Sequence, residues 1–274
     1  MHEKLFEIFL RNKKIIKESI EKIKDNIPKN LKWNELPKIE IKEKVFAIDG
    51  SYNLIKFRSF IFYAVSAVSV SNYEIFPELE IGIFPNFIEI TDILKIKMIL
   101  KELELAKKFD DIVILDGSLT SFYNFKPSFL DIDEFKEYID EWKKIRESID
   151  EISKKENLIF SVAKSSNISK LSKIPPSYFY EDFDVGYSEI FEENQFISFY
   201  FKLSKNSQVF KCTTFKKNVN KVDKILSILK NIQINGYPYL LKKAHNASKI
   251  TLKDIKLMAK LAGITERTVR EVLE

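Results

Sequence analysis

Strand-like and helix-like hydrophobic patterns follow one another in a definite order between residues 45 and 163. Three segments rich in β-branched and aromatic residues come first, and turn residues separate them. Two helical segments then alternate with two short apolar runs. We therefore expect the order β-β-β-α-β-α-β, with strands at 45–48, 59–71, 73–85, 112–115 and 158–163 and helices at 92–108 and 131–155.

That order is typical of the ribonuclease H-like topology, an α/β fold in which helices flank a mixed β-sheet. Around this core we expect a helix at 3–25, strands at 195–203 and 207–215, and helices at 220–233, 237–247, 251–262 and 266–273. We expect one domain over 1–274, with an N-terminal helix and loop (1–40), the core (41–175) and a C-terminal part (176–274). That last part would hold the aromatic-rich strands and a helical extension that completes the site.

Composition excludes several kinds of functional site. The six glycines form neither a dinucleotide-binding nor a P-loop pattern, and one cysteine cannot form a disulfide within the chain or a Cys-rich zinc site. Because His2 lies next to the start, histidine chemistry would depend on His245. A net charge of +5 is compatible with nucleic acid, and equally with an ordinary solvated surface. No apolar run could span a bilayer, so we expect a cytoplasmic protein without membrane contact.

Two Asp-Gly-Ser triplets, at 49–51 and 116–118, each follow an apolar strand. An aspartate at such a strand end lies on the rim of the sheet, and the glycine beside it allows a tight turn and close approach of a ligand. Either triplet could simply form a turn. The two strands are adjacent in the proposed topology, however, so Asp49 and Asp116 would come together and need a cation between their charges.

The predicted helix at 92–108 could supply a third carboxylate. Helical projection places Glu102 within the apolar sector, where a carboxylate requires a partner. Lys95 lies nearby on the same projection and could form a salt bridge with it. A metal ion facing the strand ends would instead make Glu102 a ligand.

Three further side chains are candidates for the site. Tyr237 and His245 would lie close to one face of a continuous helix, with Pro238 in its first turn. They could equally be a packed tyrosine and a surface histidine. Lys164 follows the last core strand and could contact DNA phosphate, although an isolated lysine is more often solvated.

Four blocks of this sequence occur in the order found in the NurA nuclease family. They are Ala47-Ile48-Asp49-Gly50-Ser51, Glu102 with Ala106, Leu115-Asp116-Gly117-Ser118-Leu119, and Gly236-Tyr237-Pro238 with Ala244-His245. The chain resembles that family from residue 45 to about residue 257. The resemblance implies a ribonuclease H-like nuclease domain that hydrolyses DNA with manganese, as a 5′-to-3′ exonuclease and single-strand endonuclease. It also implies a homodimer that docks on a hexameric HerA-type helicase during resection of double-strand breaks.

The resemblance also assigns site residues. Asp49, Glu102 and Asp116 correspond to the acidic metal ligands, with Glu104 as the alternative to Glu102, and Tyr237 and His245 correspond to a C-terminal pair. One or two Mn²⁺ ions, or Mg²⁺, would bind the three carboxylates. His245 would complete the metal site or transfer a proton, and Tyr237 would position the DNA end or the attacking water.

Two other functions fit the sequence. Ala259, Gly263 and Val269 have helix-turn-helix spacing, which would suit a DNA-binding regulator, although a plain helical hairpin fits the same residues. A ribonuclease H-like scaffold without activity could instead serve as a helicase adaptor, but its retained carboxylates argue against that function.

Overall fold

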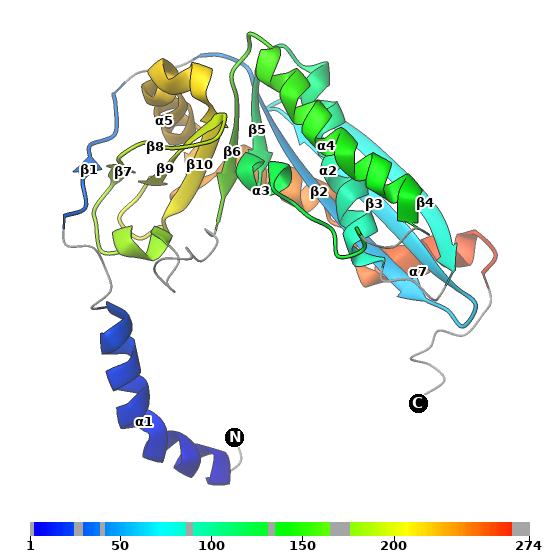
Figure 1. Ribbon diagram of the computed structural model, residues 1–274, viewed down its shortest axis with the longest axis horizontal. Helices are drawn as coiled ribbons and strands as arrows, with labels where there is room; N and C mark the ends of the chain where they lie inside the picture. Colours follow the sequence, from blue (N-terminus) through cyan, green and yellow to red (C-terminus); the bar gives the residue numbers. More distant parts are fainter. Residues whose placement is uncertain are drawn as a thin grey trace.

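A computed structural model describes residues 3–24, 30–38, 42–85, 90–130, 135–164 and 176–264. Most of these residues build one mixed ten-stranded sheet with helices on both faces (Figure 1). The predicted α/β class, a ribonuclease H-like mixed sheet flanked by helices, is confirmed.

The five predicted core strands are present and adjacent. They are β2 (Val45–Lys56), β3 (Phe60–Val70), β4 (Ile75–Pro85), β5 (Ile112–Asp116) and β6 (Ile159–Ala163). Strands β2, β3 and β4 form an antiparallel meander, while β5 pairs in parallel with both β2 and β6. The predicted adjacency of the two strands that carry the triplets is therefore confirmed.

The aromatic-rich strands continue the same sheet. Strand β10 (Phe210–Phe215) pairs antiparallel with β6 and with β9 (Phe196–Lys202). The edge beyond β9 is built from β7 (Gly186–Ser188), β8 (Phe191–Glu193) and β1 (Trp33–Asn34). The full order is β1-β7-β9-β10-β6-β5-β2-β3-β4, with β8 paired to β9.

Helices cover both faces of the sheet. On one face α2 (Thr91–Lys108) lies against the sheet, α4 (Lys136–Lys154) packs on α2, and short α3 (Leu119–Tyr123) follows β5. On the other face lie α5 (Val222–Asn231) and α6 (Tyr239–Ser248), while α7 (Leu252–Leu261) covers the far ends of β2 and β3. Because side chains alternate along a strand, Ile48 faces α2 and Ala47 faces α6.

The predicted end of the strand at 45–48 is wrong. Strand β2 does not turn at Asp49-Gly50-Ser51 but runs on to Lys56, because its pairing with β3 continues to the partner Ile61. Pairing with β5 stops at Ile48, so Asp49 lies inside β2, one residue beyond the end of the parallel ladder. The second triplet behaves as predicted, since β5 ends at Asp116 and Gly117 has a left-handed φ of 107°.

The outer helices differ from prediction in detail. The amphipathic helix α1 (Glu3–Lys24) is present, with Leu5, Ile8 and Phe9 exposed. The predicted helix at 220–233 is a 3₁₀ helix η3 (Lys216–Lys221) followed by α5, and the predicted helix at 266–273 lies outside the described residues. A second 3₁₀ helix, η2, spans Pro176–Tyr180. Within the described ranges, no helix combines the length and apolar character that crossing a membrane requires.

Candidate metal centre

Strands β2 and β5 bring Asp49 and Asp116 to one face of the sheet. The parallel pair Ile48–Leu115 places the residues that follow it side by side. Strand alternation directs both carboxylates toward the face covered by α6. The meeting of these carboxylates, predicted from the two triplets, is present in the structure.

Helix α6 adds His245 to this pair. Its Nδ1 lies 2.8 Å from Asp49 Oδ2, and ligand atoms of Asp49, Asp116 and His245 all lie within 4.8 Å of one another. The Asp49 side chain is largely buried, whereas that of His245 is half exposed. Two carboxylates and an imidazole at this spacing form a donor set suited to a divalent metal ion.

Glu102 approaches Gly50 from the opposite face of the sheet. A Cβ at Gly50 would lie 2.6 Å from Met98 Cγ and closer still to Glu102 Oε1. The missing side chain at Gly50 therefore gives the Glu102 carboxyl room against β2. Glu102 is 1% exposed, and its Oε2 has no hydrogen-bond partner among the residues described. Lys95 does not pair with it, because its Nζ lies 4.2 Å from the Phe125 ring centroid.

Burial and mutual repulsion raise the pKa values of Glu102 and Asp49. Burial raises the pKa of Glu102 well above its ordinary value, and the charges of Asp49 and Asp116 raise it further. Burial also raises the pKa of Asp49, Asp116 adds to that rise, and the bond to His245 opposes it. A cation bound by Asp49, Asp116 and His245 would offset the repulsion between the aspartates and the effect of their charge on Glu102, so this cluster fits a divalent metal.

Serine side chains on β2 and β3 position α6, a contact that no sequence pattern indicates. Ser51 and Ser66, on β2 and β3, both donate hydrogen bonds to the carbonyl of Ser248 at the end of α6. Ser51 Oγ also accepts a bond from the Ile250 amide at 3.0 Å. The serine of the first triplet therefore helps to position the helix that carries His245.

Tyr237 reaches the site from a hairpin rather than from a helix. Strands β11 (Gln233–Ile234) and β12 (Tyr237–Pro238) flank Asn235 and Gly236, both with positive φ, and α6 begins only at Tyr239. The predicted helical start at Tyr237 is therefore wrong. The Asn-Gly pair is a strong two-residue hairpin signal that could have revealed this turn.

Lys164 lies between Asp116 and Tyr237. Its Nζ is 3.4 Å from Asp116 Oδ2 and 5.3 Å from the Tyr237 ring centroid. Although burial alone would lower it, the pKa of Lys164 is raised by the Asp116 charge and by Tyr237. Burial and Asp116 raise the pKa of Tyr237. The structure thus brings both predicted residues to the edge of the carboxylate cluster.

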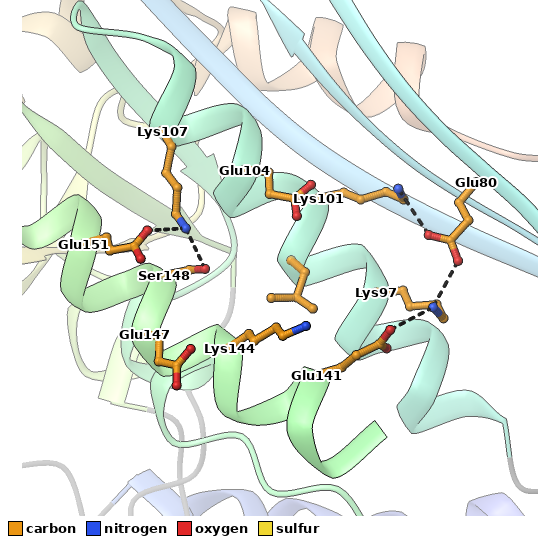
Figure 2. A pocket seen from close by; sticks show the side chains of 11 residues that line it. Glu80, Lys97, Lys101, Glu104, Lys107, Glu141, Lys144, Glu147, Ser148 and Glu151 are labelled. Atoms are coloured by element: carbon orange, nitrogen blue, oxygen red, sulfur yellow. Dashed lines mark hydrogen bonds and ion pairs between the residues drawn. The ribbon is translucent and has the colours of Figure 1, made fainter. Parts of the chain in front are cut away.

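Glu104 belongs to a different part of the molecule. It is exposed and lines a cavity of about 380 Å³ between α2 and α4, with lysines and glutamates around it (Figure 2). The structure therefore places Glu102, not Glu104, behind Gly50 and beside the aspartates. Of the predicted helix-turn-helix residues, Ala259 and Gly263 are described, and Val269 lies outside the described residues.

Comparisons with known proteins agree with this arrangement. Residues 43–250 match the family model described as the NurA domain. The chain is 38% identical over 110 residues to the probable DNA double-strand break repair nuclease NurA of Methanocaldococcus jannaschii, a match that covers 40% of this chain and 25% of the relative. It is 25% identical to the DNA double-strand break repair nuclease NurA of Sulfurisphaera tokodaii, over 98% of each protein.

Solved structures share the fold over nearly the whole chain. The NurA nuclease from Sulfolobus solfataricus matches with a TM-score of 0.75 at 23% identity, covering 96% of this chain and 97% of that one. A NurA structure bound to dAMP and manganese matches with a TM-score of 0.64 at 13% identity, covering 99% and 98%.

Proposed function

The chain belongs to the NurA family, and on that premise we propose that it is a metal-dependent DNA nuclease. One observation carries the proposal: Asp49, Asp116 and His245 offer ligand atoms within 4.8 Å of one another, beside the buried carboxyl of Glu102. Metal-assisted hydrolysis of a phosphodiester uses such a cluster of carboxylates on a rigid sheet.

Asp49, Asp116, Glu102 and His245 would hold one or two divalent ions. When bound, such an ion would polarise the scissile phosphate and lower the pKa of the attacking water. We propose Mn²⁺ as the preferred ion, with Mg²⁺ as the alternative, since Mg²⁺ favours an all-oxygen shell more strongly. The manganese in the dAMP-bound NurA structure supports this preference.

The protein's own side chains would orient DNA and move protons. The hydrogen bond between Nδ1 and Asp49 would fix the His245 ring. It would leave Nε2 to coordinate the metal ion or to exchange a proton. Lys164 would bind a DNA phosphate beside Asp116. Tyr237, on the hairpin next to Lys164, would position the DNA end or the attacking water.

Family membership also supports finer parts of the proposal. We propose 5′-to-3′ exonuclease and single-strand endonuclease activity in the resection of double-strand breaks. The names of the two relatives support the part of this proposal that concerns double-strand break repair. The partners would be DNA, a second copy of this chain and a HerA-type hexameric helicase. Because cellular DNA is the proposed substrate, the protein would work in the cytoplasm.

Cleavage of end-labelled DNA tests the proposed function. Single- and double-stranded DNA, labelled at the 5′ or 3′ end, would be incubated with EDTA, Mg²⁺ or Mn²⁺. We expect loss of substrate with metal only, and the labelled products report polarity. Sequence-specific binding without cleavage would favour the regulator, and no cleavage with any metal would contradict the nuclease.

A further inference from the structure

A cavity of about 440 Å³ opens beside the candidate metal centre. Lys164 and Tyr237 line it, and Lys164 Nζ is 3.4 Å from Asp116 Oδ2. The cavity therefore shares a wall with the carboxylate cluster. Its volume falls within the range of roughly 300–1,000 Å³ that is typical of small-ligand sites.

Helix α6 connects this cavity to the metal centre. Tyr239 and Lys242 both line the cavity, and His245 follows at the same three-residue spacing. Residues three apart are neighbours on a helix surface, so these three side chains form one row that leads to Asp49. A ligand that spans the row would touch the cavity and the metal centre together.

The hairpin between β11 and β12 forms another wall. Asn235 and Gly236 have φ values of 53° and 80°, and a Cβ at Gly236 would collide with Ser204 and Ser207. The turn is therefore packed closely against the loop before β10, which also places Gln208 in the lining. Amide side chains such as Gln208 and Asn235 can form hydrogen bonds with the edge of a base.

The charge of the lining has one sign. Two lysines and no carboxylate line the cavity, and Lys242 forms no ion pair with any residue that the structure describes. Tyr239 is 42% exposed, so its ring is accessible to a planar ligand. Cationic groups beside an accessible aromatic ring are the combination that binds single-stranded nucleic acid.

We propose that this cavity binds the nucleotide next to the scissile phosphate of single-stranded DNA. Lys164 and Lys242 contact the flanking phosphates, and Tyr239 stacks on the unpaired base. This assignment rests on the proposed nuclease function and adds to it the side chains that hold the single strand beside the metal centre.

Binding without metal tests the proposal independently of cleavage. The full-length protein would be titrated into a labelled single-stranded oligonucleotide in EDTA, with fluorescence anisotropy read at several salt concentrations. For Tyr239→Ala we expect binding about fivefold weaker or more, with an unchanged salt slope, since a base loses its stacking partner. For Lys242→Ala we expect the slope of log Kd against log salt to fall by about 0.7, the value for one lost phosphate contact.

Two matched variants serve as controls. Tyr73→Ala removes a tyrosine that is 95% exposed in the loop between β3 and β4, and Lys144→Ala removes a lysine from the groove of Figure 2. Both control variants should bind the single-stranded oligonucleotide with the affinity and the salt slope of the wild type. A control that weakens binding as much as its cavity counterpart overturns the assignment.

A hairpin duplex with closed ends separates stacking from general attraction. The Tyr239→Ala variant should bind this duplex with the same affinity as the wild type. An equal loss of affinity for the duplex and for the single strand overturns base stacking by Tyr239. If wild-type protein cleaves no DNA with any metal while the single-strand binding pattern holds, the proposed function fails and the binding cavity stands. If cleavage occurs but neither cavity variant alters binding or KM, the cavity assignment alone fails.

Discussion

Carboxylates gather in two regions on opposite sides of α2, and the two regions treat their charge differently. One region is the cavity between α2 and α4, called the groove below, where Lys97 lies 3.1 Å from Glu80 and 3.3 Å from Glu141 (Figure 2). On the sheet side, His245 lies 2.8 Å from Asp49 and Lys164 lies 3.4 Å from Asp116. One oxygen of the buried Glu102 carboxyl has no hydrogen-bond partner among the described residues. The groove supplies its own counter-charge, and the sheet side leaves negative charge to be balanced.

The pKa shifts of the two regions run in opposite directions. Burial alone would raise the pKa of Glu80, but Lys97 and Lys101 lower it. Burial raises the pKa of Glu102, and the neighbouring aspartates raise it further. A dense group of charged residues therefore does not by itself mark a functional site. A functional site is better indicated by carboxylates that have no matching cationic side chain.

Removal of a central carboxylate should have the largest effect. We expect Asp116→Asn to reduce metal-dependent DNA cleavage by about 1,000-fold or more, because a bound metal supplies several kcal/mol of transition-state stabilisation. Glu141→Gln, in the paired groove, should keep activity within about twofold. Initial rates on end-labelled DNA measure both, and equal losses would remove the distinction between the two regions.

The glutamates two residues apart on α2 give a closer comparison. Glu102→Gln should lower metal affinity or activity by about 10- to 100-fold, the usual range for a residue that supports a metal site. Glu104→Gln should change neither by more than about twofold, because Glu104 faces the groove. DNA cleavage rates measured at several metal concentrations distinguish the two variants. A larger effect of Glu104→Gln would show that Glu104 and not Glu102 supports the metal site.

Gly50→Ala tests how the two faces of the sheet meet. The added methyl group would collide with Glu102 and Met98, so we expect a destabilisation of about 1–3 kcal/mol together with reduced activity. Denaturant unfolding of a double-mutant cycle with Glu102→Ala measures the coupling. If the two destabilisations simply add, Gly50 does not make room for Glu102.

Stability of the metal-free protein should depend on pH in opposite ways in the two regions. The pKa of Glu102 is higher in the folded protein than its ordinary 4.5, so its contribution is fully present below that value and is lost as pH rises through the folded pKa. The pKa of Glu80 is lowered, so its contribution is present above 4.5 and is lost as pH falls.

Melting temperatures in EDTA across this pH range measure both contributions. Glu102→Gln should become more stable than the wild type as pH rises, and Glu80→Gln should be less stable at neutral pH. Each kcal/mol corresponds to roughly 2–4 °C. The wild-type loss at high pH should be reversed by Mn²⁺, and parallel curves for wild type and Glu102→Gln would contradict the burial of an uncompensated carboxyl.

Much of this arrangement could be predicted from local sequence. The order of strands and helices is typical of the ribonuclease H-like topology, in which the strands at 45–48 and 112–115 are neighbours, and this predicted that Asp49 and Asp116 would meet. Helical periodicity placed Glu102 among apolar residues, and the structure has it buried. These predictions succeed because they need only the pattern within short segments and the order of those segments along the chain.

Other features depend on residues far apart in the sequence. Ser51 bonds to the carbonyl of Ser248 across 197 positions. The pairing of His245 with Asp49 spans 196 positions. No local pattern contains such contacts. The hairpin before Tyr237 is different, since Asn235-Gly236 carries a local signal for that turn.

Calorimetric titration of Mn²⁺ into the DNA-free protein tests the central claim, that unbalanced carboxylates under α6 hold a divalent cation. Wild-type protein should bind Mn²⁺, Asp116→Asn should bind it at least tenfold more weakly, and Glu141→Gln should match the wild type. Equal Mn²⁺ affinity for folded Asp116→Asn and wild-type protein would contradict the claim.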